Sequence, residues 1–378
     1  MKFKLLGLNP ILLNNLKKQY ITETTDIQEK VIPPALSGRN IIARAQTGTG
    51  KTLSYLLPIF QKQIKDAGQA LILAPTRELC EQVYVVAKSV APDNIRIVGI
   101  YGGHNVKSQA DKLQAQADVV IATPGRLMDH IRRGNLNLKN LEFFVVDEVD
   151  QMFLFGFAED ILFILKKLPA PKQTFMLSAT VPSEVVSLGK KIMSNILMIE
   201  SDDREVVSLN IKQFAIITKQ ELKLKALIHY IKTINPFMAI IYCNSKARAE
   251  ELYNRLITEK FKSIDLIQGD MSQNKRERIL KNFKDLKTQF LISTDLTARG
   301  LDIAGITHII NYDIPKDKEY YVHRIGRTGR MGEEGSAVSI VSEKDINKLE
   351  QIEKKLNLKI KRVYNRSNIE EKKISYPF

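Results

Sequence analysis

The sequence predicts an α/β protein with two domains, each a mostly parallel sheet flanked by helices, joined by a short linker. Short apolar runs alternate with longer helical stretches along the 378 residues, which is typical of strands buried on both faces between layers of helices. This alternation occurs twice, and a polar, acidic stretch without helical periodicity separates the two copies. We therefore assign residues 1–204 to the first domain, 205–210 to the linker, 211–360 to the second domain and 361–378 to a basic tail.

The predicted strands are runs of four to six residues rich in Ile, Val, Leu or Phe, and turn-forming residues bound most of them. In the first domain these runs cover residues 40–43, 70–74, 96–101, 119–122, 143–146 and 174–177. In the second domain they cover residues 238–242, 263–267, 290–293, 308–312 and 337–341. Helical stretches between successive runs are the crossovers that parallel strands require.

Composition places the chain among globular proteins. Hydrophobic residues make up 44% and charged residues 26%, which excludes a mainly disordered chain. No run of about 18 apolar residues is present, so no membrane span is expected. Pro10 and several Asn interrupt what would be the core of a secretory signal. Cys80 and Cys243 lack a second Cys or a His at metal-ligand spacing, so we expect buried reduced thiols in a cytoplasmic protein.

The charge balance is strongly basic. Lys and Arg number 57 against 42 Asp and Glu, a net charge of +15 that both halves of the chain share. A polyanion is the natural partner of such a surface, because each cation set against a phosphate releases a bound counterion. A generally basic, soluble surface is the alternative, and charge alone does not decide between the two.

A glycine-rich segment follows the first predicted strand and precedes a helical run. It matches the phosphate-binding pattern G-x-x-x-x-G-K-[ST], with alanine at the first position: Ala45, Gln46, Thr47, Gly48, Thr49, Gly50, Lys51 and Thr52. The glycines let backbone N–H groups turn toward a phosphate, the lysine adds a cation, and the threonine hydroxyl suits Mg²⁺. The sequence therefore predicts a nucleotide phosphate site, against the alternative of a glycine turn before a helix.

Two carboxylates follow the strand at residues 143–146. Ligands of parallel α/β sheets lie beyond the carboxyl ends of the strands, so Asp147 should reach the same edge as the glycine-rich segment. Asp147 can hold Mg²⁺ through its water shell, and Glu148 can orient and deprotonate an attacking water. An acidic strand end is alternatively a helix N-cap, but together with Lys51 and Thr52 it predicts a nucleoside triphosphatase.

Two further motifs give the chain a family resemblance. Ser178-Ala179-Thr180 follows the next strand, and His323-Arg324-Ile325-Gly326-Arg327-Thr328-Gly329-Arg330 lies near the end. With Asp147-Glu148-Val149-Asp150, the chain resembles the DEAD-box ATP-dependent RNA helicases of superfamily 2, with a DEVD variant of the name-giving motif. The resemblance covers about residues 3–341 and implies two RecA-like domains, ATP and Mg²⁺ as cofactors, and RNA as the partner.

The resemblance also implies nucleotide contacts outside the glycine-rich segment. Gln28 resembles the adenine reader, since an amide can pair with N6 and N7 of the base, although a surface helix residue is the alternative. Phe3 resembles the aromatic that stacks on the base, and Asp302 resembles the ribose contact. The chain departs from the family at Thr24, where proline is usual, and at Ile21, where an aromatic residue is usual.

Other positions resemble residues that connect ATP hydrolysis to the second domain. Arg327 and Arg330 resemble arginine fingers, which stabilise the transferring phosphoryl group. The resemblance assigns a coupling role to Asp150, Ser178, Thr180 and His323. A structural histidine is the alternative at position 323.

Six short segments resemble the family's RNA contacts, which go mostly to the backbone and carry little sequence information. In the first domain they contain Pro75, Thr76, Arg77, Gly102, Gly103, Thr123, Pro124, Gly125 and Arg126, and in the second Gly269, Arg276 and Thr294. Any single segment is alternatively a set of turn and cap residues of the α/β scaffold.

The predicted function is that of an RNA helicase that binds single-stranded RNA across two domains and couples ATP hydrolysis to local duplex unwinding. An ATP-gated RNA clamp with little unwinding and a DNA translocase are the alternatives that the same motifs allow. We expect a monomeric core that contacts no membrane and that protein partners can target. The tail, with its excess of basic residues, is either a frayed end or a tether for structured RNA.

Overall fold

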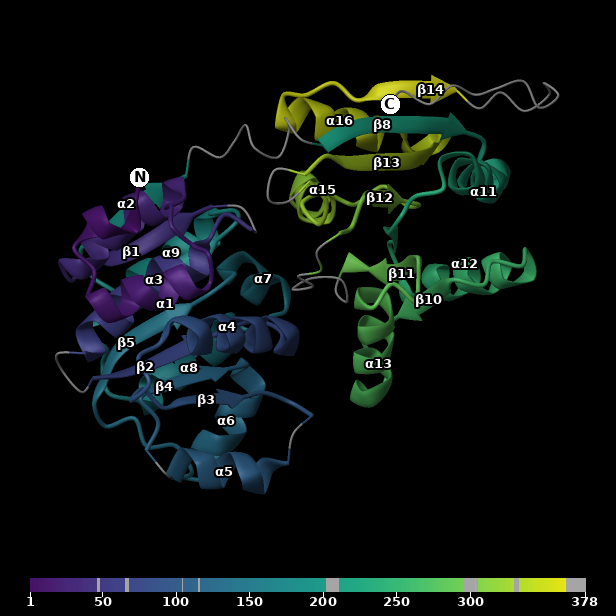
Figure 1. Cartoon of the computed structure of the whole chain (residues 1–378). Coiled ribbons are helices and arrows are strands. Elements are labelled where there is room, and N and C mark those ends of the chain that lie inside the picture. The colour runs from purple at the N-terminus through teal and green to yellow at the C-terminus, as the bar shows by residue number, and fades with distance from the viewer. Residues whose placement is uncertain are drawn as a thin grey trace. The chain divides into compact units, whose positions relative to one another are not determined.

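The computed structural model describes residues 1–45, 48–64, 68–103, 105–114, 116–201, 211–295, 303, 305–329 and 333–364. The chain forms two compact units, Met1–Asp203 and Arg204–Phe378 (Figure 1). Five predicted features therefore lie outside the described residues: Gln46, Thr47, Asp302, Arg330 and the linker at 205–210. The last part of the predicted tail, residues 365–378, also lies outside them.

The first unit contains a parallel sheet in the strand order β3-β4-β2-β5-β6-β1-β7. Its strands are β1 (Asn40–Arg44), β2 (Gln69–Leu73), β3 (Ile97–Ile100), β4 (Val119–Ala122), β5 (Leu141–Val146), β6 (Gln173–Ser178) and β7 (Ile196–Glu200). Its α-helices are α1 (Pro10–Lys18), α2 (Asp26–Leu36), α3 (Lys51–Gln63), α4 (Arg77–Val90), α5 (Val106–Gln114), α6 (Pro124–Arg132), α7 (Val149–Leu154), α8 (Ala158–Lys167) and α9 (Ser183–Ile192). A short 3₁₀ helix, η1 (Phe3–Leu6), precedes them.

Helices cover both faces of this sheet, which is why its strands read as continuous apolar runs. The apolar residues of α1 to α4 pack on one face together with Ile41, Ala70 and Val145. Those of α5 to α9 pack on the other face with Ile42, Leu71 and Val146. Alternate residues of each strand therefore serve opposite cores, as the pleat of a strand dictates.

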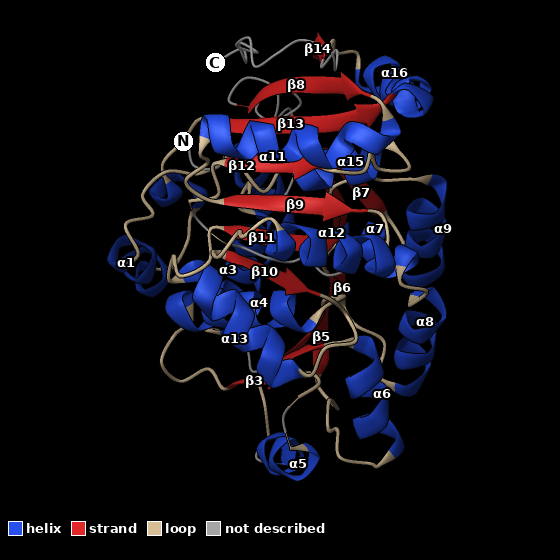
Figure 2. Cartoon of the chain, turned by 90° about the vertical axis from the view of Figure 1, so that its right-hand side faces the viewer, coloured by secondary structure: helices blue, strands red, loops and turns tan. Residues whose placement is uncertain are grey.

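The second unit contains a parallel sheet in the order β10-β11-β9-β12-β13-β8-β14 (Figure 2). Its strands are β8 (Ile211–Thr218), β9 (Ala239–Cys243), β10 (Ile264–Ile267), β11 (Phe290–Thr294), β12 (His308–Asn311), β13 (Gly335–Ser342) and β14 (Lys361–Tyr364). Its helices are η2 (Gln220–Leu222), α11 (Lys223–Ile234), α12 (Lys246–Thr258), α13 (Gln273–Lys284), α15 (Lys318–Ile325), η3 (Glu343–Asp345) and α16 (Ile346–Leu356). Counted along the chain within each unit, the two sheets have the same strand order.

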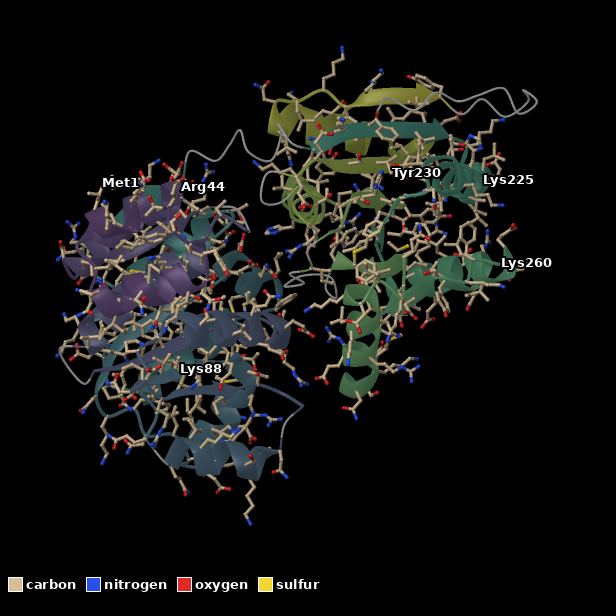
Figure 3. The ribbon with its side chains drawn as sticks, in the orientation of Figure 1. Met1, Arg44, Lys88, Lys225, Tyr230 and Lys260 are labelled. Atoms are coloured by element: carbon tan, nitrogen blue, oxygen red, sulfur yellow. The ribbon has the colours of Figure 1, made fainter. Side chains whose placement is uncertain are left out.

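Two separate cores hold the helices of the second unit to its sheet. Residues of α11 and α12 pack on one face, and those of α13, α15 and α16 pack on the other. Figure 3 shows the contrast between core and surface: Tyr230 of α11 lies inside the unit and is fully buried, whereas Lys225 and Lys260 lie at its outer edge. The predicted fold class is thus confirmed in both units.

Each predicted strand is present, and three strands are additional. β7 and β14 are edge strands with half-exposed side chains. β14 lacks the apolar run used to predict strands, whereas the apolar residues 196–199 of β7 were not assigned to a strand. β8 lies next to the acidic stretch assigned to the linker, and its run of apolar residues was not recognised. The predicted tail differs from the structure at its start, because Lys361–Tyr364 pairs with β8 as part of the second sheet. No helix among the described residues is long and apolar enough to span a bilayer.

Candidate functional site

The glycine-rich segment lies between β1 and α3 in the first unit. The N–H of Ala45 donates to the carbonyl of Ser178 at 3.0 Å, which ties the start of the segment to the end of β6. Gly50 has φ +86°, in the left-handed region that glycine adopts readily. A Cβ at this position would also lie 2.3 Å from Gln28 Nε2, so a larger residue would have to displace the Gln28 amide.

Lys51 is the first residue of α3, beside the backbone N–H groups that begin the helix. Its side chain is only 6% exposed, and its Nζ has no hydrogen-bond partner among the described residues. A buried ammonium group without a partner is costly, and a helix N-terminus favours an anion. The position therefore fits a phosphate, with the half-buried Thr52 next to it.

Asp147 follows β5 and is 3% exposed. It accepts hydrogen bonds from the hydroxyl of Tyr55 on α3 at 2.9 Å and from the N–H of Glu148 at 2.9 Å. Burial raises the pKa of Asp147 to about 6, and Lys51 opposes this shift. A cation at this carboxylate would replace the solvation that burial removes.

Glu148 combines burial with an unfavourable backbone conformation. Its side chain is 2% exposed, its φ is +49°, and its Oε2 has no hydrogen-bond partner within the described part of the chain. Non-glycine residues in this region cost about 1 kcal/mol or more and persist where the surrounding structure holds them. The carboxylate is therefore held at the strand end next to Asp147.

Asp150 connects this strand end to the loop after β6. Its Oδ2 accepts from the N–H of Thr180 at 3.0 Å and from the Thr180 hydroxyl at 2.9 Å, and its own N–H donates to Ser178 Oγ at 3.1 Å. Val149 between these carboxylates is fully buried in the core with α8 and α9. The valine thus has a packing role, as its apolar side chain suggests.

The two residues predicted to contact the base, Gln28 and Phe3, lie in the first unit, and both are buried. Gln28 is 2% exposed, which excludes the surface alternative; its Oε1 accepts from Thr25 N–H at 2.9 Å and its Nε2 donates to the Gly50 carbonyl at 3.0 Å. Phe3, expected to stack on a base, is 2% exposed and packs in the core. The turn of η1 directs it inward, so in this structure it is a core side chain.

The three predicted RNA segments of the first unit lie close together. Arg77 packs against the backbone of Gly103, where an added Cβ would lie 1.7 Å from Arg77 Nη1, and its guanidinium lies 5.8 Å from the centre of the Tyr101 ring. Thr76 caps α4 by accepting from Leu79 N–H at 3.2 Å. Thr123 precedes α6, in which Pro124, the exposed Gly125 and Arg126 form the first turn.

Gln109 of α5 is a residue that the sequence analysis missed. It is 3% exposed and accepts a hydrogen bond from Arg126 Nη1 at 3.0 Å, while its Nε2 donates to the Tyr101 carbonyl at 2.9 Å. No local motif marks such a contact, because it depends on how α5 packs beside α6 and β3.

In the second unit the residues predicted to contact RNA and nucleotide lie on several different elements. Gly269 is exposed after β10, Arg276 is half-buried on α13, and Thr294 ends β11 at 7% exposure. His323 and Arg327, in and after α15, are 6% and 3% exposed.

Arg324 lies between these two residues, and the sequence predicted no role for it. It is 1% exposed and hydrogen-bonds Asp295, Asn311, Asn244 and the Asp313 carbonyl. Arg324 therefore anchors α15 to the ends of β9, β11 and β12, and its charge is neutralised within the unit.

The fold and the candidate site together define the class of protein. A phosphate-binding segment, an acidic strand end and two parallel sheets of equal strand order characterise a two-domain nucleoside triphosphatase. Residues 25–188 match the family "DEAD/DEAH box helicase" and residues 222–332 match "Helicase conserved C-terminal domain".

Curated relatives narrow the class. The chain is 40% identical over 355 residues to ATP-dependent RNA helicase CshA of Listeria monocytogenes, covering 93% of this chain and 68% of that protein. It is 39% identical over 364 residues to DEAD-box ATP-dependent RNA helicase CshA of Geobacillus kaustophilus, covering 96% and 78%. The chain belongs to the DEAD-box family of ATP-dependent RNA helicases.

Solved structures agree with this family. Saccharomyces cerevisiae Dbp5 bound to RNA and ADP BeF3 has a TM-score of 0.87 and 32% identity, covering 96% of this chain and 95% of that chain. The helicase Mss116 bound to single-stranded RNA and UDP-BeF has a TM-score of 0.87 and 28% identity, covering 97% and 80%. These likenesses support the assignment of the two units of this chain as RecA-like domains.

Proposed function

We propose that the phosphate-binding segment and acidic strand end of the first unit hydrolyse ATP, and that this hydrolysis drives local remodelling of RNA duplexes. The observation that carries the proposal is the group of buried charges at one edge of the sheet. Lys51 Nζ and Glu148 Oε2 lack hydrogen-bond partners among the described residues, and Asp147 has a raised pKa. Buried charges of this kind are explained by a charged ligand that completes the site.

The residues of this site have separate roles in the proposed reaction. Lys51 and the N–H groups at the start of α3 bind the phosphates, and Thr52 and Asp147 would hold Mg²⁺, which neutralises charge on the phosphates when bound. No cluster of three or more His, Cys, Asp or Glu side chains occurs in the described part of the chain, so such an ion would share its ligands with nucleotide and water. Glu148 orients and deprotonates the attacking water.

The DEVD sequence serves as the DEAD motif in this proposal. The variant position, Val149, is buried in the core, whereas Asp147, Glu148 and Asp150 keep the carboxylates. Asp150 couples the nucleotide site to Ser178 and Thr180 through the hydrogen bonds described above. Gln28 ties the helix α2 to the Gly50 carbonyl and retains one N–H for adenine.

The second unit contributes to the same reaction. Arg327 and Arg330 stabilise charge on the transferring phosphoryl group, and Asp302 contacts the ribose; His323 supports this coupling. The proposal rests on their motif and on the family, since Asp302 and Arg330 lie outside the described residues. We expect Arg327→Ala and Arg330→Ala each to lower RNA-stimulated turnover by about 10³-fold, the usual effect of removing an arginine finger.

RNA contacts are proposed at Arg77, Gly103, Thr123 and Arg126 in the first unit and at Gly269, Arg276 and Thr294 in the second. Exposed helix N-termini and guanidinium groups suit backbone phosphates, so the protein should bind RNA with little sequence preference. Dbp5, to which the chain is similar, is described as bound to RNA.

The deciding experiment measures Mg²⁺-ATP hydrolysis by the full chain without nucleic acid, with single-stranded RNA and with DNA of the same sequence. Stimulation by RNA that Glu148→Gln abolishes, together with release of a strand from a short RNA duplex, supports the proposal. Equal stimulation by DNA contradicts the choice of RNA, and RNA binding without strand release contradicts remodelling.

We also propose a monomeric core in the cytoplasm. In each unit helices cover both faces of the sheet, and Cys80 and Cys243 are buried and unpaired, as is usual in a reducing compartment. Light scattering of the purified chain and fractionation of cells would test these two points.

A further inference from the structure

A buried polar cluster lies beneath the proposed RNA contacts of the first unit, where α5, α6 and β3 meet (Figure 1). Its centre is Gln109. The Gln109 Oε1 lies 3.0 Å from Arg126 Nη1 and 3.2 Å from His130 Nε2, and Gln109 Nε2 donates to the Tyr101 carbonyl at 2.9 Å. Asn135 Nδ2 lies 3.3 Å from His130 Nδ1 on the opposite side of the ring.

These contacts form one consistent set of donors and acceptors. Asn135 donates to His130 Nδ1, so the neutral ring carries its proton on Nε2 and donates to Gln109 Oε1. His130 is fully buried, and burial, assisted by Arg126, lowers its pKa, which keeps the ring neutral. Both lone pairs of Gln109 Oε1 are thereby used, one by His130 and one by Arg126.

The cluster also connects to the other RNA segments. Tyr101, whose carbonyl Gln109 binds, directly precedes Gly102 and Gly103 and lies 5.8 Å beneath the guanidinium of Arg77. Arg77 in turn packs against Gly103. Gln109 therefore connects Arg126 on α6 to the segment that carries Gly103, against which Arg77 of α4 packs.

We propose that Gln109 is a positioning residue for RNA binding, which fixes the direction of the Arg126 guanidinium and the Tyr101–Gly103 backbone before RNA arrives. This inference rests on the proposed role of Arg126 as an RNA phosphate contact. Pre-set groups lose less conformational entropy on binding, so disruption should weaken RNA affinity without changing ATP chemistry.

The test uses the full chain with a fluorescein-labelled single-stranded RNA and a non-hydrolysable ATP analogue, and measures affinity across a salt series. Gln109→Met removes the donor and the acceptor at similar volume, and Gln114→Met, on the exposed side of α5, is the matched control. We expect Gln109→Met to weaken RNA binding about fivefold or more, with Gln114→Met unchanged. The slope of log affinity against log salt should fall by about 0.7, the value of one lost phosphate contact on a single strand.

A double-mutant cycle distinguishes the loss of Arg126 positioning from a general disturbance of the fold. Arg126→Ala should reduce the salt slope by the same amount, and adding Gln109→Met to it should cause less than about twofold further loss, since both act through one contact. Full additivity, or Gln109→Met binding RNA as tightly as Gln114→Met, overturns the inference. If Arg126→Ala itself binds RNA normally, the proposed RNA contact fails as well, so the two failures are distinguishable.

A second variant covers the case in which Gln109→Met does not fold. Gln109→Glu keeps acceptors for Arg126 and His130, but its carboxylate pairs with the guanidinium and repels the Tyr101 carbonyl. We expect weaker RNA binding and a smaller salt slope, while turnover at saturating RNA and the KM for ATP stay within about twofold of wild type. Wild-type RNA affinity in this variant overturns the inference.

Discussion

Lys223 and Asp313 form an ion pair in the second unit at the two positions that Lys51 and Asp147 occupy in the first. Lys51 begins the helix after β1, and Asp147 follows β5; Lys223 begins the helix after β8, and Asp313 lies just beyond β12. β1 and β8 are sixth in their sheets, and β5 and β12 are fourth. The Lys223 Nζ lies 3.1 Å from Asp313 Oδ1, with side chains 3% and 13% exposed.

Because the two sheets have the same strand order, the surroundings of the two lysines can be compared directly. In the second unit no glycine-rich segment follows β8, and the lysine is satisfied by the carboxylate and by the Tyr312 ring, 4.8 Å away. In the first unit the corresponding lysine has no hydrogen-bond partner among the described residues. One scaffold position thus forms an ion pair in one unit and, in the proposed function, binds phosphate in the other.

The first prediction concerns Lys223→Met. Removing Lys223 leaves Asp313 with Arg248 Nη2, 3.5 Å away, as its remaining cation, so the free energy of unfolding should fall by about 1–3 kcal/mol. Urea denaturation followed by circular dichroism measures the loss, and Lys225→Met on the exposed side of α11 is the matched control. Equal stability of the two variants would contradict a structural role for the pair, and ATP affinity should be unchanged in both.

The second prediction concerns Lys51→Met, which should affect ATP hydrolysis strongly and the free energy of unfolding little. Its ammonium group is buried and has no hydrogen bond to lose within the described residues, so nucleotide-free stability should stay within about 1 kcal/mol of wild type or rise. ATP hydrolysis should fall by about 10²–10³-fold, the effect of losing a preorganised charge at a reacting phosphate. The same urea assay and a phosphate-release assay measure both quantities. A large loss of stability with normal hydrolysis would show that Lys51 is structural.

The third prediction uses the left-handed backbone of Glu148. Glu148→Ala and Glu148→Gly both remove the carboxylate and should abolish hydrolysis equally, but only alanine keeps the unfavourable φ of +49°. Glu148→Gly should therefore be more stable than Glu148→Ala by about 1 kcal/mol. Thermal unfolding without nucleotide compares the pair. Greater stability of the alanine variant would mean that this conformation is not strained.

The sequence predicted those features that are contiguous along the chain. The glycine-rich segment, the acidic strand end and the eleven predicted strands each occupy one short stretch, so periodicity and residue type identify them. The edge strand β14 was missed because its side chains are exposed or half exposed and it has no apolar run, whereas the short apolar run of β7 was not assigned to a strand.

Contacts between distant elements were harder to predict. Gln109 and Arg324 act through hydrogen bonds to residues on other elements, which depend on helix packing and rotamers that no local pattern records. Phe3 shows a different limit of sequence reasoning. An aromatic side chain can serve a binding site or a core, and only the turn of η1 shows that this one packs inward.

The last prediction concerns pH and His308 at the start of β12. Its Nδ1 lies 2.8 Å from Thr307 Oγ1, its Nε2 has no partner in the described part of the chain, and burial lowers its pKa to about 4. Between that value and the ordinary histidine pKa of about 6.5, the unfolded chain binds a proton that the folded chain does not. The contribution of His308 should therefore make stability fall as pH falls through this range, and have no effect above it.

Urea denaturation at a series of pH values would measure this contribution as a difference between proteins. His308→Gln removes the imidazole, so its stability should decline less than that of wild type toward pH 4, with the two proteins parallel above the ordinary histidine pKa. His229→Gln, an exposed histidine of α11, measures the effect of losing a surface imidazole. Parallel curves for wild type and His308→Gln over the whole range would show that the folded chain protonates His308 as readily as the unfolded chain does. In that case the ring would have to be as accessible to solvent as in the unfolded chain, in conflict with its half-buried position beside Tyr230, whose ring centre lies 6.3 Å away.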